Sequence, residues 1–227
     1  MNSSPTKGRL SPEVHSWLTW LTPETQAALA AAATPMEYNV GQRLYAPKSA
    51  PTGLYIIREG QIRITFQSPS GDHHLLKIAS PGGIVGDLAC VDGQPYPVFT
   101  EAMSLCKIDF ISLKRFRALR DEHVDIDKAL LRHFARLSRT MINMMEVTFL
   151  GGLTARVAAR LLFLAHDHGS DTLSISQTDI GLMAGLSRQA TNKALGELKS
   201  LSLIENRYNK IKILDHEGLL NFKNQYS

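Results

Sequence analysis

The chain has 227 residues, 44% hydrophobic and 20% charged, which is enough apolar material for two folded domains and excludes a disordered chain. The formal net charge of +4 is a mild basic excess, compatible with nucleic-acid contact without requiring it. Two cysteines are too few for a disulfide framework, no apolar run is long enough to cross a bilayer, and no signal-peptide core is present. We therefore expect a cytoplasmic globular protein with no membrane partner.

Residues 1–35 are expected to form an N-terminal helical segment. Residues 1–9 are polar and should fray. Farther along, Pro23 follows Thr22 as proline does at a helix start, and an alanine-rich stretch ends before Pro35. The pattern predicts one or two helices whose role is packing.

Residues 36–113 change to short alternating or apolar runs separated by glycine. The runs are QRLYA, GLYIIREG, QIRITFQ, HHLLKIAS, IVGDLACV and VFTEAMSLCKIDF. Regularly spaced short strands with turn signals predict a compact β-barrel or sandwich, with a hairpin tip at residues 69–72.

Residues 114–150 predict a short helix at 114–122 and then a long one. Apolar residues recur there at alternating four- and three-residue steps, which is typical of a coiled-coil seam: Leu130, Phe134, Leu137, Met141 and Met144. A single such stripe more often packs into its own core. A second stripe lies beside the first, at Leu131, Ile142, Met145 and Phe149. One face can therefore meet the rest of the chain and the other a second copy, which predicts a two-fold parallel homodimer.

Residues 151–227 begin with Gly151 and Gly152, which interrupt the helical pattern and predict a hinge. In the next expected helix, Arg156 and Arg160 should face outward. The following stretch reads as two short helices. Ser176 is expected to cap the first and Ser187 the second. Ala184 and Gly185 between them allow a sharp turn.

The second short helix divides into two faces. Ala190, Ala194, Leu195 and Leu198 should face inward. Arginine can pair with guanine and glutamine or asparagine with adenine in the major groove, so we expect base contacts from Arg188, Gln189 and Asn192. Hydroxyl and lysine side chains suit phosphates, and the expected phosphate contacts are Ser176, Thr178, Ser187, Lys193 and Lys199. The alternative is an ordinary helical hairpin with a solvated charged face.

A short basic hairpin favours the DNA-reading interpretation. Residues 206–209 are turn formers, and the alternating segment 210–213 follows them. This arrangement is typical of the wing of a winged helix-turn-helix.

The segment GLSRQATNKALGELKSLSLI resembles the recognition segment of the cAMP receptor protein and fumarate-nitrate regulator (Crp/Fnr) family of bacterial transcription regulators. The resemblance extends over nearly the whole chain. It implies an α+β fold with an N-terminal cyclic-nucleotide-binding-like β-roll (a jelly roll), a long dimerisation helix and a C-terminal winged helix-turn-helix.

Three further segments resemble motifs of that roll in order: YIIREGQIRI, SPGGIVGDLACVDG and CKIDF. Gly60 and Gly86 stand where the turns of the roll need glycine. The residues expected to fill its interior are Leu54, Ile56, Ile62, Ile64, Leu76 and Ile78.

The resemblance also implies an effector pocket, whose candidate residues are Gly86, Asp87, Leu88, Tyr96, Pro97, Met141 and Ile142. In cAMP-binding members a Gly-Glu-Leu helix holds the ribose and phosphate, and an Arg-Ser pair completes the phosphate site. Here Asp87 replaces the glutamate, and Tyr96 and Pro97 stand where arginine and serine are expected. A phosphodiester without its charged partner forfeits roughly 1.5 to 3 kcal/mol. Apolar Met141 and Ile142 also stand where hydroxyl residues would face the adenine. We therefore expect no cAMP dependence and no cofactor, with the effector unknown.

The histidines and cysteines give weaker signals. No spacing among His73, His74, His166 and His168 selects a metal or haem ligand set, so no metal site is expected. Cys90 and Cys106 lie in apolar segments and are expected to be buried and inert, the alternative being a redox pair.

The expected function is that of a homodimeric, sequence-specific transcription regulator. Its partners would be double-stranded DNA, a second copy of the chain and, for an activator, RNA polymerase. A cyclic-nucleotide-responsive regulator using a non-standard pose and a ligand-binding module without DNA activity are the alternatives. An enzyme is not expected, because no nucleophile–base arrangement or phosphate-binding glycine loop occurs.

Overall fold

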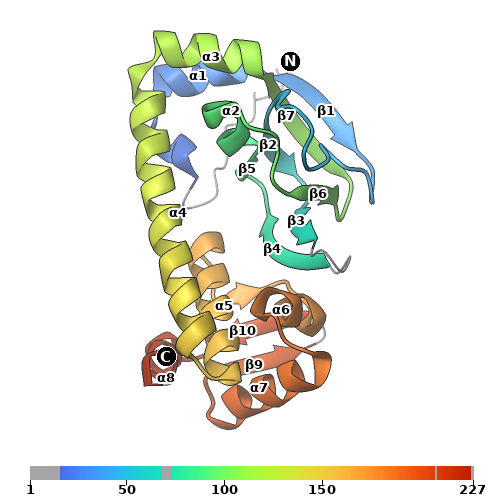
Figure 1. The fold of residues 1–227 in the computed structure, drawn as a ribbon, viewed down its shortest axis with the longest axis vertical. Helices are drawn as coiled ribbons and strands as arrows, with labels where there is room; N and C mark the ends of the chain where they lie inside the picture. The colour runs from blue at the N-terminus through green and yellow to red at the C-terminus, as the bar shows by residue number, and fades with distance from the viewer. Residues whose placement is uncertain (1–15, 68–72, 208, 226–227) are drawn as a thin grey trace, which may run out of the picture.

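The computed structural model describes residues 16–67, 73–207 and 209–225. They form a β-roll, a long helix that passes along one side of it, and a C-terminal domain below the roll, beside the lower part of that helix (Figure 1). The expectations for residues 1–9 and for a hairpin tip at 69–72 lie outside the described residues.

The N-terminal helices are η1 (Trp17–Trp20) and α1 (Pro23–Ala32). Thr22 caps α1 because its Oγ1 accepts a hydrogen bond from the backbone N–H of Thr25 at 3.2 Å, and Pro23 occupies the first turn. Trp17 and Leu18 are buried against α3 (Leu113–Glu122) and α4 (Val124–Leu150), so this segment is a packing element, as the sequence predicted.

The roll consists of two antiparallel sheets and one short helix. Its elements are β1 (Thr34–Tyr38), β2 (Gly53–Glu59), β3 (Ile62–Gln67), β4 (His73–Ala79), β5 (Ile84–Val85), α2 (Asp87–Asp92), β6 (Phe99–Ala102) and β7 (Cys106–Ser112). One sheet has the order β1-β7-β2-β5 and the other β4-β3-β6. The run QRLYA is not a strand. It is apolar because Leu44 and Tyr45 are buried in a loop, where the Tyr45 N–H donates to Thr100 Oγ1.

The expected interior of the roll is correct except at Leu76, which is 36% exposed. Strands β3 and β4 pair Ile64 with Lys77 and Thr65 with Leu75, so Leu76 is the extra residue of a β-bulge. The bulge changes the alternation of β4 and leaves Leu75 and Ile78 buried instead.

Leu75 and Ile78 do not pack inside the roll alone. They belong to the same apolar cluster as the core of the C-terminal domain, whose helix α6 (Gln177–Ala184) lies against β4. In Figure 1, β4 is the strand of the roll nearest to that domain. The two domains therefore share one core.

Helices α3 (Leu113–Glu122) and α4 (Val124–Leu150) follow the roll. At 27 residues, α4 is about 40 Å long. The expected dimer seam needs correction, because Leu130 is only 3% exposed and Phe134 is half-buried, both against η1, α1 and α3 of the same chain. The stripe one position along is exposed at every residue: Leu131, Ala135, Ser138, Ile142, Met145 and Phe149. Of the expected seam, Met141 is also 47% exposed.

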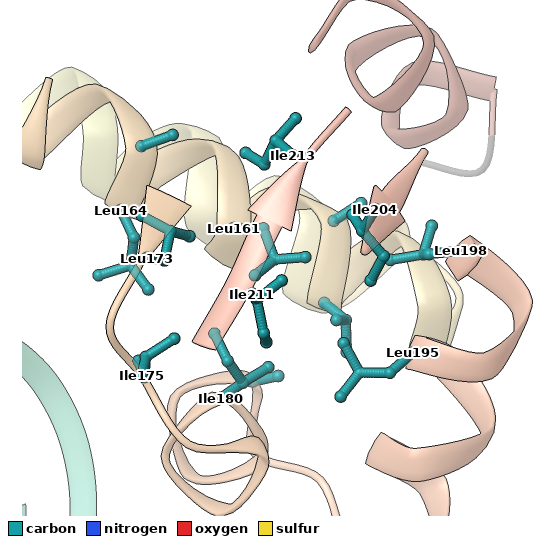
Figure 2. Packing of buried hydrophobic residues seen from close by; sticks show 14 of the residues in the cluster. Leu161, Leu164, Leu173, Ile175, Ile180, Leu195, Leu198, Ile204, Ile211 and Ile213 are labelled. Atoms are coloured by element: carbon teal, nitrogen blue, oxygen red, sulfur yellow. The ribbon is translucent and has the colours of Figure 1, made fainter. Parts of the chain in front are cut away.

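The C-terminal domain contains α5 (Leu153–His168), β8 (Thr172–Leu173), α6 (Gln177–Ala184), α7 (Arg188–Ser200), β9 (Ile204–Arg207), β10 (Lys210–Ile213) and α8 (His216–Gln225). Its sheet has the order β8-β10-β9. Figure 2 shows its core, in which Leu161 of α5, Ile180 of α6 and Ile211 of β10 point toward one another.

One expectation for the start of this domain changes. Arg156 and Arg160 are half-buried and do not face solvent freely. Arg156 donates to the carbonyl of Ala184 at the end of α6, where a cation is favoured by the helix dipole. Burial, followed by the nearby charge of Arg156, lowers the pKa of Arg160. Gly151 and Gly152 do separate α4 from α5, but both have extended backbone that any residue can adopt.

Candidate nucleic-acid interface

Helices α6 and α7 form a helix-turn-helix. Ser176 and Ser187 cap them by accepting from the N–H groups of Asp179 at 3.0 Å and Ala190 at 3.3 Å. Gly185 makes the turn with a left-handed φ of 63°. Gly181 allows the helices to approach closely, since a Cβ there would lie 2.5 Å from Thr191 Oγ1.

Helix α7 presents its polar face to solvent. Ala194, Leu195 and Leu198 are buried as predicted. The fourth inward position is Thr191, whose Oγ1 donates to the carbonyl of Ser187 at 2.9 Å, while Ala190 is half-buried. The residues expected to contact bases and phosphates from this helix are all exposed: Arg188, Gln189, Asn192, Lys193 and Lys199.

A hollow of about 500 Å³ joins this face to its surroundings. Its lining comes from the start of α6, the start of α7 and the β9–β10 hairpin: Ser176, Gln177, Thr178, Arg188, Asn192, Asn206, Arg207 and Asn209. The structure thus brings two expected base contacts and two expected phosphate contacts to one concave surface. Gln189, Ser187, Lys193 and Lys199 lie outside its lining.

Four lining residues were not among the expected DNA contacts: Gln177, Asn206, Arg207 and Asn209. The basic composition of the hairpin was visible, but its orientation was not. That orientation depends on the pairing of β10 with both β9 and β8. Arg207 is held at the rim by Glu205, whose Oε1 is 2.8 Å from Nη2, and Asn209 takes a left-handed φ of 50° in the turn.

The two capping serines differ in what they can offer a phosphate. Ser176 Oγ donates its hydrogen to Asp179 Oδ2 at 2.7 Å, so this hydroxyl has none left for DNA in this state. Ser187 Oγ accepts from Ala190 and donates to no group in the described part of the chain, so its hydrogen is available. The Ser176 hydroxyl therefore cannot donate to a phosphate in this conformation, whereas the Ser187 hydroxyl can.

Comparison with known proteins places this site in a family. The cyclic nucleotide-binding domain model matches residues 35–123, and the Crp-like helix-turn-helix domain model matches residues 155–222. The CRP-like cAMP-activated global transcriptional regulator of Mycobacterium tuberculosis H37Rv is 30% identical over 207 residues, 87% of this chain and 91% of that protein. The chain belongs to the Crp/Fnr family. It is accordingly a DNA-binding transcription regulator.

Solved structures of Crp/Fnr proteins agree with this fold. A CRP-family transcriptional regulator from Thermus thermophilus is 25% identical with a TM-score of 0.65, covering 83% of this chain and 96% of that one. FixK2 from Bradyrhizobium japonicum has a TM-score of 0.73 at 18% identity, covering 84% and 96%, and supports the fold alone.

In this Crp/Fnr chain the roll residue Tyr96 is buried where the sequence placed an effector pocket. Its hydroxyl donates to the carbonyl of Gly53 at 2.6 Å and accepts from the N–H groups of Thr52 and Gly53 at 3.0 and 3.1 Å. Its ring stacks on Tyr45 with centroids 3.8 Å apart. A Cβ on Gly86 would lie 3.2 Å from the Tyr96 ring, so these two candidates are adjacent.

The Asp87 carboxylate is also engaged by the protein. Its Oδ2 accepts from Trp17 Nε1 at 3.2 Å, and His133 Nε2 of α4 lies 3.6 Å away. Asp87 therefore links α2 to η1 and α4. The other pocket candidates, Leu88, Pro97, Met141 and Ile142, are exposed.

The cysteines and histidines were the other candidate ligands and thiols in the sequence. Cys90 and Cys106 are both buried free thiols, and burial, reinforced by the charge of Asp87, raises the pKa of Cys90 to about 12. Within residues 16–67, 73–207 and 209–225, no three His, Cys, Asp or Glu side chains cluster to hold a metal ion. None of the helices in the same residues combines the length and apolarity needed to cross a membrane.

Proposed function

We propose that this regulator is a homodimer that reads a pseudo-palindromic operator, with α7 as the recognition helix of each protomer. The observation that carries the proposal is the hollow where Arg188 and Asn192 of α7 meet the start of α6 and the β9–β10 hairpin. Exposed α7 side chains would contact base edges, and the hairpin and α6 would contact the backbone on either side. Two-fold symmetry then sets the half-sites about 34 to 36 Å apart.

The exposed stripe of α4 supports the dimer. Its six positions follow steps of 4, 3, 4, 3 and 4 residues, the a/d spacing of a parallel coiled coil. Leu131 and Phe149, at its two ends, are 74% and 77% exposed in the single chain. Ala135 and Ser138 are small, which lets two copies of the helix approach closely. A second copy of α4 would cover this stripe.

We further propose that DNA binding does not require cAMP. The Mycobacterium tuberculosis relative is named as cAMP-activated, but the polar groups that could receive a nucleotide here are already paired. Tyr96 is bonded to the β2 backbone, and Asp87 to Trp17. A nucleotide would have to break these bonds without an arginine at this position to compensate its phosphate charge.

The test is selection of a random-sequence duplex library by the purified, ligand-free protein at fixed moderate salt, repeated with saturating cAMP. Recovery of a palindromic motif without nucleotide supports both parts of the proposal. Recovery only with cAMP contradicts nucleotide independence but still supports α7 as the recognition helix. If no motif is recovered in either condition, the proposal that α7 reads DNA is contradicted.

A cyclic-nucleotide-responsive regulator with a different binding pose is the second candidate. It is favoured by the match of residues 35–123 to the cyclic nucleotide-binding domain and by the cAMP-activated relative. The cAMP arm of the same selection separates the two candidates. If the protein activates transcription, RNA polymerase is its expected further partner.

A further inference from the structure

One ion pair joins the roll directly to the helix-turn-helix. Arg63 of β3 donates from Nη2 to Asp179 Oδ1 of α6 at 3.3 Å. The side chain of Arg63 is 37% exposed and that of Asp179 only 12%. Arg63 Nε is buried with no acceptor in the described part of the chain, where the guanidinium makes its hydrogen bond from Nη2 to Asp179.

Asp179 lies at the end of α6 that lines the hollow. Its backbone N–H and its Oδ2 both bond Ser176 Oγ, closing the first turn of the helix. The preceding residue, Thr178, is exposed in the hollow. An uncompensated carboxylate at this position would repel a DNA phosphate, and Arg63 compensates it.

Apolar packing between β4 and α6 holds Arg63 and Asp179 close to each other. Leu75 and Ile78 of β4 share a buried cluster with Ile180 and Met183 of α6. Strand β4 is paired with β3, which carries Arg63. The ion pair is therefore part of a packed contact between the roll and one face of α6.

We infer that Arg63, a residue of the roll, is a positioning residue for DNA binding: it neutralises Asp179 and holds the first turn of α6 in place for the DNA backbone. Arg63 does not itself contact DNA in this assignment. The inference rests on the proposed function, because it requires that the start of α6 face the duplex.

The test is a double-mutant cycle on the full-length protein, using the operator recovered by library selection and fluorescence anisotropy at several salt concentrations. Arg63→Ala should weaken operator binding by about two- to fivefold per protomer, as expected for a partly exposed ion pair, and by the square of that factor for two protomers. In an Asp179→Asn background, which keeps oxygen and amide groups for the Ser176 cap, the same change should have almost no effect.

Two controls separate positioning from general loss of stability or of charge. Arg58 pairs with Asp109 inside the roll, and their side chains are 29% and 12% exposed, close to the values for Arg63 and Asp179. Arg58→Ala therefore removes a comparable ion pair that does not contact the helix-turn-helix. Arg58→Ala should leave operator affinity unchanged. Arg63→Lys should retain most of the affinity, because the charge remains.

The salt dependence of operator binding distinguishes this positioning role from a direct contact between Arg63 and a phosphate. Losing a direct phosphate contact lowers the magnitude of the slope of log K against log salt by about one whichever residue is at position 179, whereas Arg63→Ala should leave the slope unchanged in the Asp179→Asn background. Unchanged or tighter operator binding by Arg63→Ala, or an equal loss in the Asp179→Asn background, overturns the inference. Absence of operator binding by the unaltered protein would instead mean that the proposed function had failed.

Discussion

Arg188 and Ser176 both stand at the start of a helix of the helix-turn-helix, yet their side chains differ in the hydrogen-bond donors that they can offer to DNA. Arg188 is exposed, lines the hollow and presents a guanidinium suited to a guanine edge. Ser176 donates its hydroxyl hydrogen to Asp179. The sequence assigned both residues by type, and the difference came from the hydrogen bonds that each already makes.

Arg188→Ala should weaken operator binding by about 1–3 kcal/mol per half-site and relax the preference at one base pair, because a bidentate base contact is lost. The measurement is competition between operator and random duplexes at constant salt. Lys193→Ala is the comparison variant: an exposed lysine outside the hollow should weaken binding to every sequence alike and lower the salt slope by about one. Equal losses on operator and random DNA for Arg188→Ala would count against its assigned role.

Cys90 should resist thiol reagents in the folded protein. Its pKa of about 12 leaves a very small thiolate fraction at pH 8, and the side chain is buried. We expect slow labelling at pH 8 and rapid labelling of both cysteines in denaturant, followed by intact-protein mass spectrometry. By linkage, the stability that comes from keeping this thiol protonated is complete below about pH 8.5 and is lost as the pH rises toward about 12. Rapid native labelling of Cys90 would revive the redox alternative.

At the scale of elements, the α6–α7 contact depends on a missing side chain. Gly181→Ala should lower the free energy of unfolding by about 1–3 kcal/mol, because its Cβ would fall 2.5 Å from Thr191 Oγ1, a stiff side chain bonded to Ser187. Gly196→Ala on exposed α7 is the matched control. Its Cβ meets nothing within 4 Å, so better helix propensity should stabilise the protein by about 0.5–1 kcal/mol. Chemical denaturation measures both, and equal effects would refute the packing argument.

The two apolar stripes of α4 have different partners. One packs at Leu130 and Phe134 on the chain's own N-terminal helices, and the other is exposed. Both stripes follow the same spacing, so periodicity indicated two apolar faces without telling which would stay free. The presence of η1 and α1 against one face decides it.

Ile142→Glu should convert the dimer to monomers, because it places a charge in the middle of the exposed stripe. Sedimentation velocity at micromolar protein measures the change. Asn143→Glu introduces the same charge at the next residue, which is exposed but lies off the stripe, and should leave a dimer. A dimer for both variants would move the interface away from this face.

At the scale of the whole molecule, the core shared between the domains predicts one cooperative unfolding transition. Both tryptophans lie in η1, so their fluorescence reports the N-terminal half, while circular dichroism reports all helices. The two signals should change together on heating. Leu75→Ala removes a buried contact between β4 and the C-terminal core and should cost about 2–5 kcal/mol, separating the two transitions.

Leu76→Ala is the control at the neighbouring position. Leu76 is the exposed residue of the bulge, so its truncation should leave a single transition with little change in midpoint. Separated transitions in the unaltered protein would contradict the shared core.

Sequence reasoning predicted most of the elements, since their signals are local. The Thr22-Pro23 start of α1, the serine caps of α6 and α7, the Gly185 turn and the inward row of α7 each depend on a few neighbouring residues. Sequence reasoning failed at Leu76, where a β-bulge shifts the inward–outward alternation of β4 by one residue. It also failed at QRLYA, where apolar residues are buried in a loop and not in a strand.

By itself, the sequence determined the family, the order of roll, long helix and helix-turn-helix, and the polar face of α7, because caps, turns and periodicity are written into contiguous residues. Only the tertiary structure decided which wing residues join the reading surface, which stripe of α4 remains free, and that Tyr96 and Asp87 are bonded within the protein. It also decided that Arg63 reaches Asp179 across 116 positions of chain. Such contacts depend on how separate elements pack, and no local pattern specifies that packing.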